Sequence, residues 1–197
     1  MEDRSEKFVA IVSAAKTLFW KHGIRRVSIE EICQEADVSK MTFYKYFSNK
    51  TAAAIYLIEE MFHSGMKAYK EIFNSNIPYE EKVKRVIELK MSNTHDLSQE
   101  LFDDLYKNKD PEIDSTIEKI KNEMLDVYLE DFRESQKKGE IRADVKPEFI
   151  LYFLNHLTEM LTDEKLVSIY PNPEQMILEV LSFFFYGIMP NNTKLNK

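Results

Sequence analysis

The chain has 197 residues, of which 44% are hydrophobic and 31% are charged, a composition typical of one or two globular domains. Four glycines and six prolines are too few for a β-sandwich or barrel, and neither common glycine-rich phosphate loop occurs. One cysteine, Cys33, excludes an intramolecular disulfide. No apolar stretch has the length of a secretory signal or a membrane span, so we expect a cytoplasmic protein without a membrane partner.

The net charge of −7 is unevenly distributed along the chain. Residues 1–50 contain nine Lys or Arg against seven Asp or Glu, whereas residues 51–197 contain 18 basic residues against 27 acidic ones. The distribution of charge matters more for nucleic-acid binding than its sum. It indicates a basic N-terminal module joined to an acidic body.

The first three predicted helices are short and have clear ends. Apolar residues recur with helical spacing from Phe8, and Gly23 suits the left-handed position that ends the helix. Ser28 and Glu31 have capping-box spacing and begin a second helix. Ser39 is a good N-cap for a third helix from Lys40 to about Phe47.

The remainder also predicts helices. A long fourth helix runs from about Lys50 to Phe73, and proline opens most later helices, as expected of a first helical residue. The result is an all-α fold of about nine helices without a convincing strand. We expect an N-terminal three-helix domain over residues 1–49 and a helical effector-binding and dimerisation domain over 50–197.

Residues 28–47 have the layout of a helix-turn-helix: two short helices joined by a tight turn. Asp37 in that turn is expected to adopt a left-handed or bridge conformation, which Asp tolerates better than most residues. Phe43 and Phe47 lie four residues apart and can face the core. The outward surface of the third helix is then formed by Lys40, Met41, Thr42, Tyr44, Lys45 and Tyr46.

These side chains suit double-stranded DNA. Lys40 and Lys45 can contact phosphates or guanine, and Met41 can contact thymine methyl groups. Tyrosine hydroxyls can reach phosphates, and the free amides at the starts of the second and fourth helices can bind phosphates as well. The predicted DNA-binding residues are Ser28, Ser39, Lys40, Met41, Thr42, Tyr44, Lys45, Tyr46 and Lys50.

Residues 8–55 resemble the DNA-binding domain of the TetR family of bacterial regulators. Two positions depart from the family pattern, since Asp37 stands where glycine is usual and Met41 where a small residue is usual. Cys33 stands at an alanine-like position and is expected to be a small buried hydrophobe. The matching residues are Leu18-Phe19, Gly23, Ser28, Ile32, Ala36, Val38-Ser39, Thr42, Tyr44, Tyr46-Phe47 and Lys50.

The resemblance implies a homodimer that places two helix-turn-helices in successive major grooves of a palindromic operator. Family members normally dimerise through their last two long helices, here about 147–165 and 173–189. The second is apolar on more than one face, which fits burial on both sides. The predicted interface residues are Leu157, Val180, Phe184 and Ile188.

The resemblance also implies a small-molecule effector, of unknown identity, that binds the helical body and releases a repressor from its operator. For most of the apolar residues there, ordinary core packing is the favoured interpretation. The candidate pocket residues are Phe62, Met66, Phe102, Tyr106, Tyr128, Phe132, Tyr152 and His156.

Other classes of function have weaker support. His63, His95 and His156 lack the spacing of a metal site, no cofactor motif occurs, and no catalytic arrangement indicates an enzyme. The acidic pair Asp103-Asp104 is interpreted as a solvated face. The alternative function is a TetR-like coactivator that has lost specific DNA binding and binds a protein partner.

Overall fold

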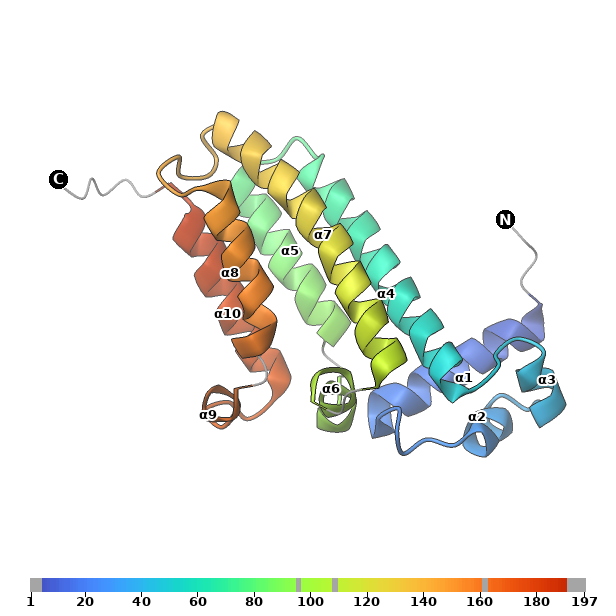
Figure 1. Cartoon of the computed structure of the whole chain (residues 1–197). Helices are drawn as coiled ribbons and strands as arrows, with labels where there is room; N and C mark the ends of the chain where they lie inside the picture. Colours follow the sequence, from blue (N-terminus) through green and yellow to red (C-terminus); the bar gives the residue numbers. More distant parts are fainter. Residues whose placement is uncertain (1–4, 95–96, 108–109, 161–162, 191–197) are drawn as a thin grey trace. The chain divides into compact units, whose positions relative to one another are not determined.

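The computed structural model describes residues 5–94, 97–107, 110–160 and 163–190, without the side chains of 93, 94, 155 and 157–159. Over these residues the chain is helical, with no strand (Figure 1). The all-α fold is therefore confirmed. The helices are α1 (Glu6–His22), α2 (Ile29–Glu35), α3 (Lys40–Tyr44), α4 (Lys50–Phe73), α5 (Tyr79–Thr94), α6 (Gln99–Tyr106), α7 (Pro111–Lys137), α8 (Pro147–Met160), α9 (Glu164–Val167) and α10 (Pro173–Ile188).

The ten helices of the described residues exceed the expected nine because of α9. This single turn is held by Asp163, whose side chain accepts hydrogen bonds from the backbone N–H groups of Lys165 and Leu166. Such a short element has no amphipathic repeat, so hydrophobic spacing does not reveal it.

The chain divides into two compact units. The N-terminal unit comprises Met1–Ser64 and Asp96–Ile120, and the C-terminal unit comprises Gly65–His95 and Lys121–Lys197. This grouping differs from the expected division after residue 49. The reason is that α6, although distant in sequence, packs against α1, and that α4 and α7 each contribute residues to both units.

In the N-terminal unit, α1 is the central element. Its buried face, which includes Ile11 and Phe19, packs against α2 and α6. From α6, Leu101 and Phe102 are buried completely, and the backbone N–H of Ser98 donates to the carbonyl of Trp20 at 3.2 Å. The helix-turn-helix therefore packs against a core that includes α6, a helix some 70 positions later in the chain.

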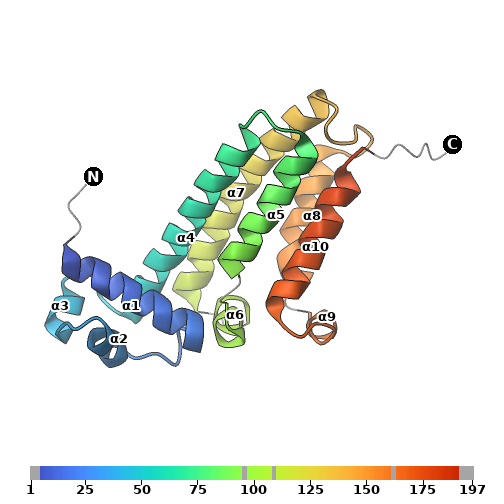
Figure 2. The ribbon, with the colours of Figure 1, turned by 180° about the vertical axis from the view of Figure 1, so that it is seen from behind.

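In the C-terminal unit, α5, α8 and α10 lie side by side with the later parts of α4 and α7 (Figures 1 and 2). The core of this unit is aromatic and aliphatic, and it includes Tyr69, Val83, Phe132, Ile150 and Phe184. No helix in the described part of the chain has the length and apolar character needed to cross a membrane.

Two helix ends differ in detail from their expected form. Gly23 has the expected positive φ of 78°, but its ψ of 161° makes the backbone extended rather than left-handed helical. The third helix ends at Tyr44, and residues 45–46 continue as a turn that brings Phe47 inward.

Candidate DNA-binding surface

The two helices of the helix-turn-helix are fixed by their N-caps. Ser28 and Glu31 form the predicted capping box: the Ser28 hydroxyl accepts from the Glu31 N–H at 3.2 Å, and the Glu31 carboxylate accepts from the Ser28 N–H at 2.7 Å. Ser39 caps α3 by accepting from the Thr42 N–H at 3.1 Å. The Ser28 N–H already donates to the Glu31 carboxylate. A phosphate could bind this N–H, as predicted, only if the capping box opened.

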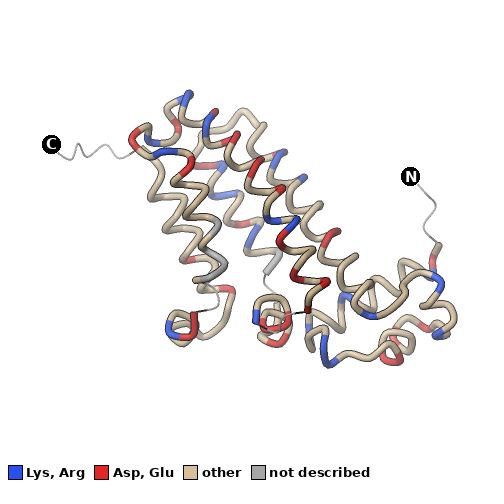
Figure 3. The backbone as a smooth tube through the Cα atoms, in the orientation of Figure 1, with Lys and Arg blue, Asp and Glu red and all other residues tan. Residues whose placement is uncertain are grey.

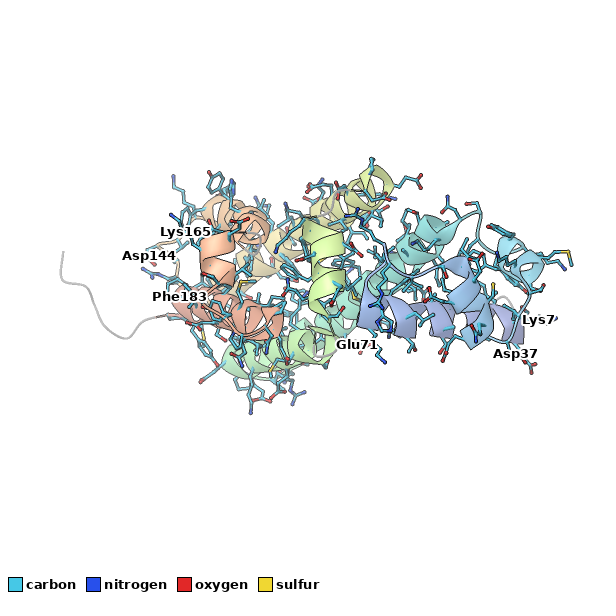
Figure 4. All side chains as sticks on the ribbon, turned by 90° about the horizontal axis from the view of Figure 1, so that it is seen from below. Lys7, Asp37, Glu71, Asp144, Lys165 and Phe183 are labelled. Carbon is cyan, nitrogen blue, oxygen red and sulfur yellow. The ribbon has the colours of Figure 1, made fainter. Side chains whose placement is uncertain are left out.

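The turn between α2 and α3 has the predicted conformation. Asp37 has a φ of 50°, in the left-handed region, and lies at the surface (Figure 4). The N–H of Val38 then donates to the carbonyl of Cys33 at 2.9 Å, and Cys33 is buried as expected. This turn sets the direction in which α3 leaves α2.

The inward face of α3 is aromatic. Phe43 is fully buried and Phe47 nearly so, which confirms the predicted inward pair. Their rings are 5.7 Å apart, and the ring of Phe47 also packs on Phe8 of α1 and Tyr56 of α4. A helix of five residues has little stability of its own, so this packing fixes α3 in place.

The outward face of α3 has large side chains at the surface. Met41 is 72% exposed and Tyr44 is 54% exposed, and Lys45 is exposed beside them. Large apolar side chains grouped on a surface mark an interaction site. Thr42 is half-buried, with its hydroxyl 3.0 Å from that of Ser39.

Lys40 lies on this surface but forms an ion pair with Glu30 of α2. The hydrogen bond to the Glu30 carboxylate raises the pKa of Lys40, and the same bond lowers the pKa of Glu30. To contact a phosphate or a base, Lys40 therefore has to break its ion pair with Glu30. Glu30 was not among the predicted site residues, because the sequence does not show that positions ten apart meet across the turn.

Two predicted DNA-binding residues have roles inside the protein. The Tyr46 hydroxyl lies 2.5 Å from Ser5 Oγ, and its ring packs edge-on against Phe8. The Lys50 ammonium donates to the carbonyl oxygens of Arg25 and Val27 at 2.9 and 2.6 Å. Burial lowers the pKa of Lys50. Direct DNA contacts by both residues remain predictions, since these groups already have protein partners.

The predicted pocket residues do not gather in one unit. Phe62, Phe102 and Tyr106 belong to the N-terminal unit, where Phe102 is fully buried in the core. The other five belong to the C-terminal unit: Met66, Tyr128 and Phe132 pack in its core, whereas Tyr152 is 63% exposed and its ring is 4.1 Å from that of His156. The interpretation of Phe102 and Phe132 as ordinary core residues accounts for their positions.

The predicted interface residues differ in how far they are exposed, and their part in a dimer interface stays a prediction. Phe184 and Ile188 are buried within their own C-terminal unit, and Val180 is half-buried. The side chain of Leu157 lies outside the described residues. The exposed face of α10 instead carries Phe183, which is 77% exposed, and Tyr186. Since Phe183, Phe184 and Phe185 are consecutive, the sequence did not indicate which of them faces outward.

Asp104 also differs from its interpretation as a solvated residue. It is only 7% exposed, and its carboxylate accepts a hydrogen bond from the Arg25 N–H at 2.9 Å. Its position between Leu101 and Leu105, both buried, is a signal that could have identified it. Within the described residues no group of three or more His, Cys, Asp or Glu could hold a metal ion, and His95 lies outside them.

Comparison with known proteins agrees with this geometry. Residues 11–55 match the profile of the family described as bacterial regulatory proteins, tetR family. The chain is 25% identical over 138 residues to an uncharacterized HTH-type transcriptional regulator, YhgD, from Bacillus subtilis, a match that covers 67% of this chain and 70% of that protein.

Solved structures with the same fold include transcriptional regulators. The fatty acid degradation regulator FadR from Bacillus halodurans is 20% identical, with a TM-score of 0.71 over 94% of this chain and 98% of that one. FadR from Bacillus subtilis, solved in complex with stearoyl-CoA, is 20% identical, with a TM-score of 0.68 over 92% and 99%. The matched residues 11–55 contain the capped α2, the Asp37 turn and the outward face of α3, so the likeness to the tetR family of bacterial regulatory proteins covers the helix-turn-helix of this chain.

Proposed function

We propose that this protein is a transcriptional repressor that binds a palindromic operator as a homodimer and is released by a small-molecule effector. The observation that carries the proposal is the outward face of α3, where Met41 and Tyr44 are exposed on a helix anchored from behind by Phe43 and Phe47. A helix anchored in this way binds DNA at little cost in backbone conformational entropy.

We propose different tasks for different residues. Met41 and Lys45 are proposed to read base edges, Met41 through thymine methyl groups and Lys45 through guanine. Ser39, Thr42 and Tyr44 are proposed to bind phosphates with their hydroxyl groups. Lys40 binds DNA after it leaves Glu30, and that carboxylate then adds local repulsion against misplaced phosphates.

Dimerisation is proposed to use the exposed apolar face of α8 and α10. Phe149 and Tyr152 on α8 and Phe183 and Tyr186 on α10 are all at least half exposed. These helices also carry few charged residues (Figure 3), and Phe183 lies at the surface (Figure 4). A second copy would cover this face by an isologous contact, and Gly187, where an added Cβ atom would meet nothing within 4 Å, permits close approach.

The effector is proposed to be a small molecule with a long apolar part. The support comes from similar structures, since one of them contains stearoyl-CoA and two more are named as regulators of fatty acid metabolism or degradation. Stearoyl-CoA is therefore the first probe to test. An effector that binds the DNA-free conformation more tightly would shift the population away from the DNA-bound one.

The test begins with selection of bound duplexes from random DNA by the full-length protein. The selected sequence is then titrated by fluorescence anisotropy at several salt concentrations, beside a scrambled duplex. We expect a palindromic consensus that binds at least about 1,000-fold more tightly than scrambled DNA, on the order typical of specific regulators. Equal binding to both duplexes would refute the proposal and favour the coactivator alternative.

The effector and the dimer are tested on the same material. Stearoyl-CoA is added to the protein–operator complex, with free coenzyme A as the matched control for its charged head group. If stearoyl-CoA releases the protein from the operator and coenzyme A does not, the result supports an acyl effector. If neither releases it, stearoyl-CoA is not the effector. The oligomeric state is measured by light scattering, where a monomer at micromolar concentration would contradict the proposed dimer.

A further inference from the structure

The link between α1 and α2, residues Gly23–Val27, connects the helix-turn-helix to the rest of the N-terminal unit. Its two apolar residues, Ile24 and Val27, are buried. Its backbone is held by side chains from two other elements. Asp104 of α6 accepts from the Arg25 N–H, and Lys50 of α4 donates to the Arg25 and Val27 carbonyls.

Asp104 is an unusual residue for its position. Its neighbours on the buried face of α6 are apolar, so an apolar residue at position 104 would continue the pattern. A buried carboxylate is costly unless it is paired and hydrogen-bonded, and its presence is weak evidence for a gain in stability. The positive charge of Lys50 interacts with Asp104: burial lowers the pKa of Lys50, and the charge of Asp104 partly opposes this lowering.

The link is also poorly packed on this side. A hollow of about 460 Å³ opens beside it, and its walls include Arg25, Lys50, Thr51, Asp104, Asp110 and Ile113. Close packing therefore does not fix the link there. On this side the hydrogen bonds with Asp104 and Lys50 hold the link, in contrast to the tightly packed aromatic side of α3.

The link and α6 also approach closely at Gly23. A Cβ atom at this position would lie 2.7 Å from the Asp104 carboxylate oxygen and 3.1 Å from Glu100 Cβ. Only glycine fits between the end of α1 and α6 with Asp104 in place. The Asp104 carboxylate and Gly23 therefore form a close contact, called here the fitted contact, that leaves no room for a side chain at position 23.

We propose that Asp104 is a positioning residue for DNA recognition, which fixes the α1–α2 link and through it the orientation of α2 and α3. Asp104 lies behind the link and is buried, so its effect on operator binding is indirect. The proposal rests on the proposed function. It adds a residue of α6, far along the chain from the recognition helix, to the determinants of operator affinity.

The test compares two opposite expectations for the DNA affinity of a variant without the negative charge of Asp104. Replacing Asp104 by Ala removes a negative charge near the DNA-binding surface, so electrostatics alone predicts tighter binding to every duplex. The proposal predicts the opposite for the operator: at least about tenfold weaker binding of the selected duplex, from loss of a charge-assisted hydrogen bond. Binding to scrambled DNA should not weaken, and the slope of log K against log salt should stay unchanged, because no phosphate contact is lost.

The matched control is Asp103→Ala. Asp103 is the neighbouring residue on α6 and carries the same charge, and its side chain bonds locally, to Gln99 at 2.8 Å and Lys107 at 3.0 Å. Asp104→Asn is the second variant, which keeps the shape and an acceptor oxygen for the Arg25 N–H. We expect no loss of operator affinity for Asp103→Ala and a smaller loss for Asp104→Asn than for Asp104→Ala.

The outcomes separate this proposal from the proposed function. A wild-type protein without sequence preference overturns both. A selective wild-type protein whose operator affinity is unchanged in Asp104→Ala overturns only the role of Asp104. If Asp104→Ala fails to fold, Asp104→Asn decides: a weakened operator complex with an unchanged salt slope supports the proposal, and unaltered binding refutes it.

Discussion

Replacement of Gly23 by Ala tests the fitted contact between α1 and α6 most directly. The backbone at Gly23, with φ 78° and ψ 161°, lies in a region that is essentially reserved for glycine and costs other residues about 1–3 kcal/mol. The new Cβ would also displace Asp104 from the Arg25 N–H, a hydrogen bond to a charged group that contributes about 1.5–3 kcal/mol. We therefore expect a loss of about 2.5–6 kcal/mol in the free energy of unfolding of the N-terminal unit.

The assay is urea unfolding followed by the fluorescence of Trp20, the single tryptophan of the chain, whose carbonyl accepts from Ser98. Gly139→Ala is the matched control: Gly139 also has a positive φ, of 73°, but its Cβ would meet nothing within 4 Å. In the Asp104→Ala background, Gly23→Ala should cost only the backbone part, because the hydrogen bond is already lost. Strictly additive costs, or a loss below about 1 kcal/mol for Gly23→Ala, would refute this reasoning.

Three further predictions concern other parts of the chain. Phe183→Glu should abolish dimerisation with little effect on the fold of the protomer, because Phe183 is exposed while Phe184 forms the core; an unchanged mass by light scattering would contradict this. Lys50→Met should lower the free energy of unfolding by about 1–3 kcal/mol with an unchanged salt slope of DNA binding, whereas a slope smaller by about one would show a phosphate contact instead. Burial raises the pKa of Asp131, so ionisation of this carboxyl disfavours folding. The penalty is complete above the raised pKa, and it is lost as the pH falls from there to the ordinary pKa of aspartate. Asp131→Asn, which keeps an acceptor for the Tyr69 hydroxyl, should therefore raise the midpoint of thermal unfolding at about pH 7, and its advantage should shrink on acidification; an advantage that grows in acid would contradict the assigned cause.

The sequence alone determined the features that depend on near neighbours. The capping box of Ser28 and Glu31, the cap at Ser39 and the positive φ of Asp37 each involve groups within a few residues, so local spacing predicts them. The inward pair Phe43 and Phe47 followed from helical spacing, even though the helix itself is shorter than expected. These features together were sufficient to predict a helix-turn-helix of this family.

The tertiary structure alone decided which side chains remain available for binding. Arg25 and Asp104 are 79 positions apart, and Lys50 reaches carbonyls 23 and 25 positions earlier, so no spacing rule connects them. The three consecutive phenylalanines of α10 are equally apolar, and only the packing of the C-terminal unit shows that Phe184 faces its core while Phe183 faces outward. Hydrophobic periodicity records that a face is apolar, but which surface covers it depends on contacts between residues distant in the chain.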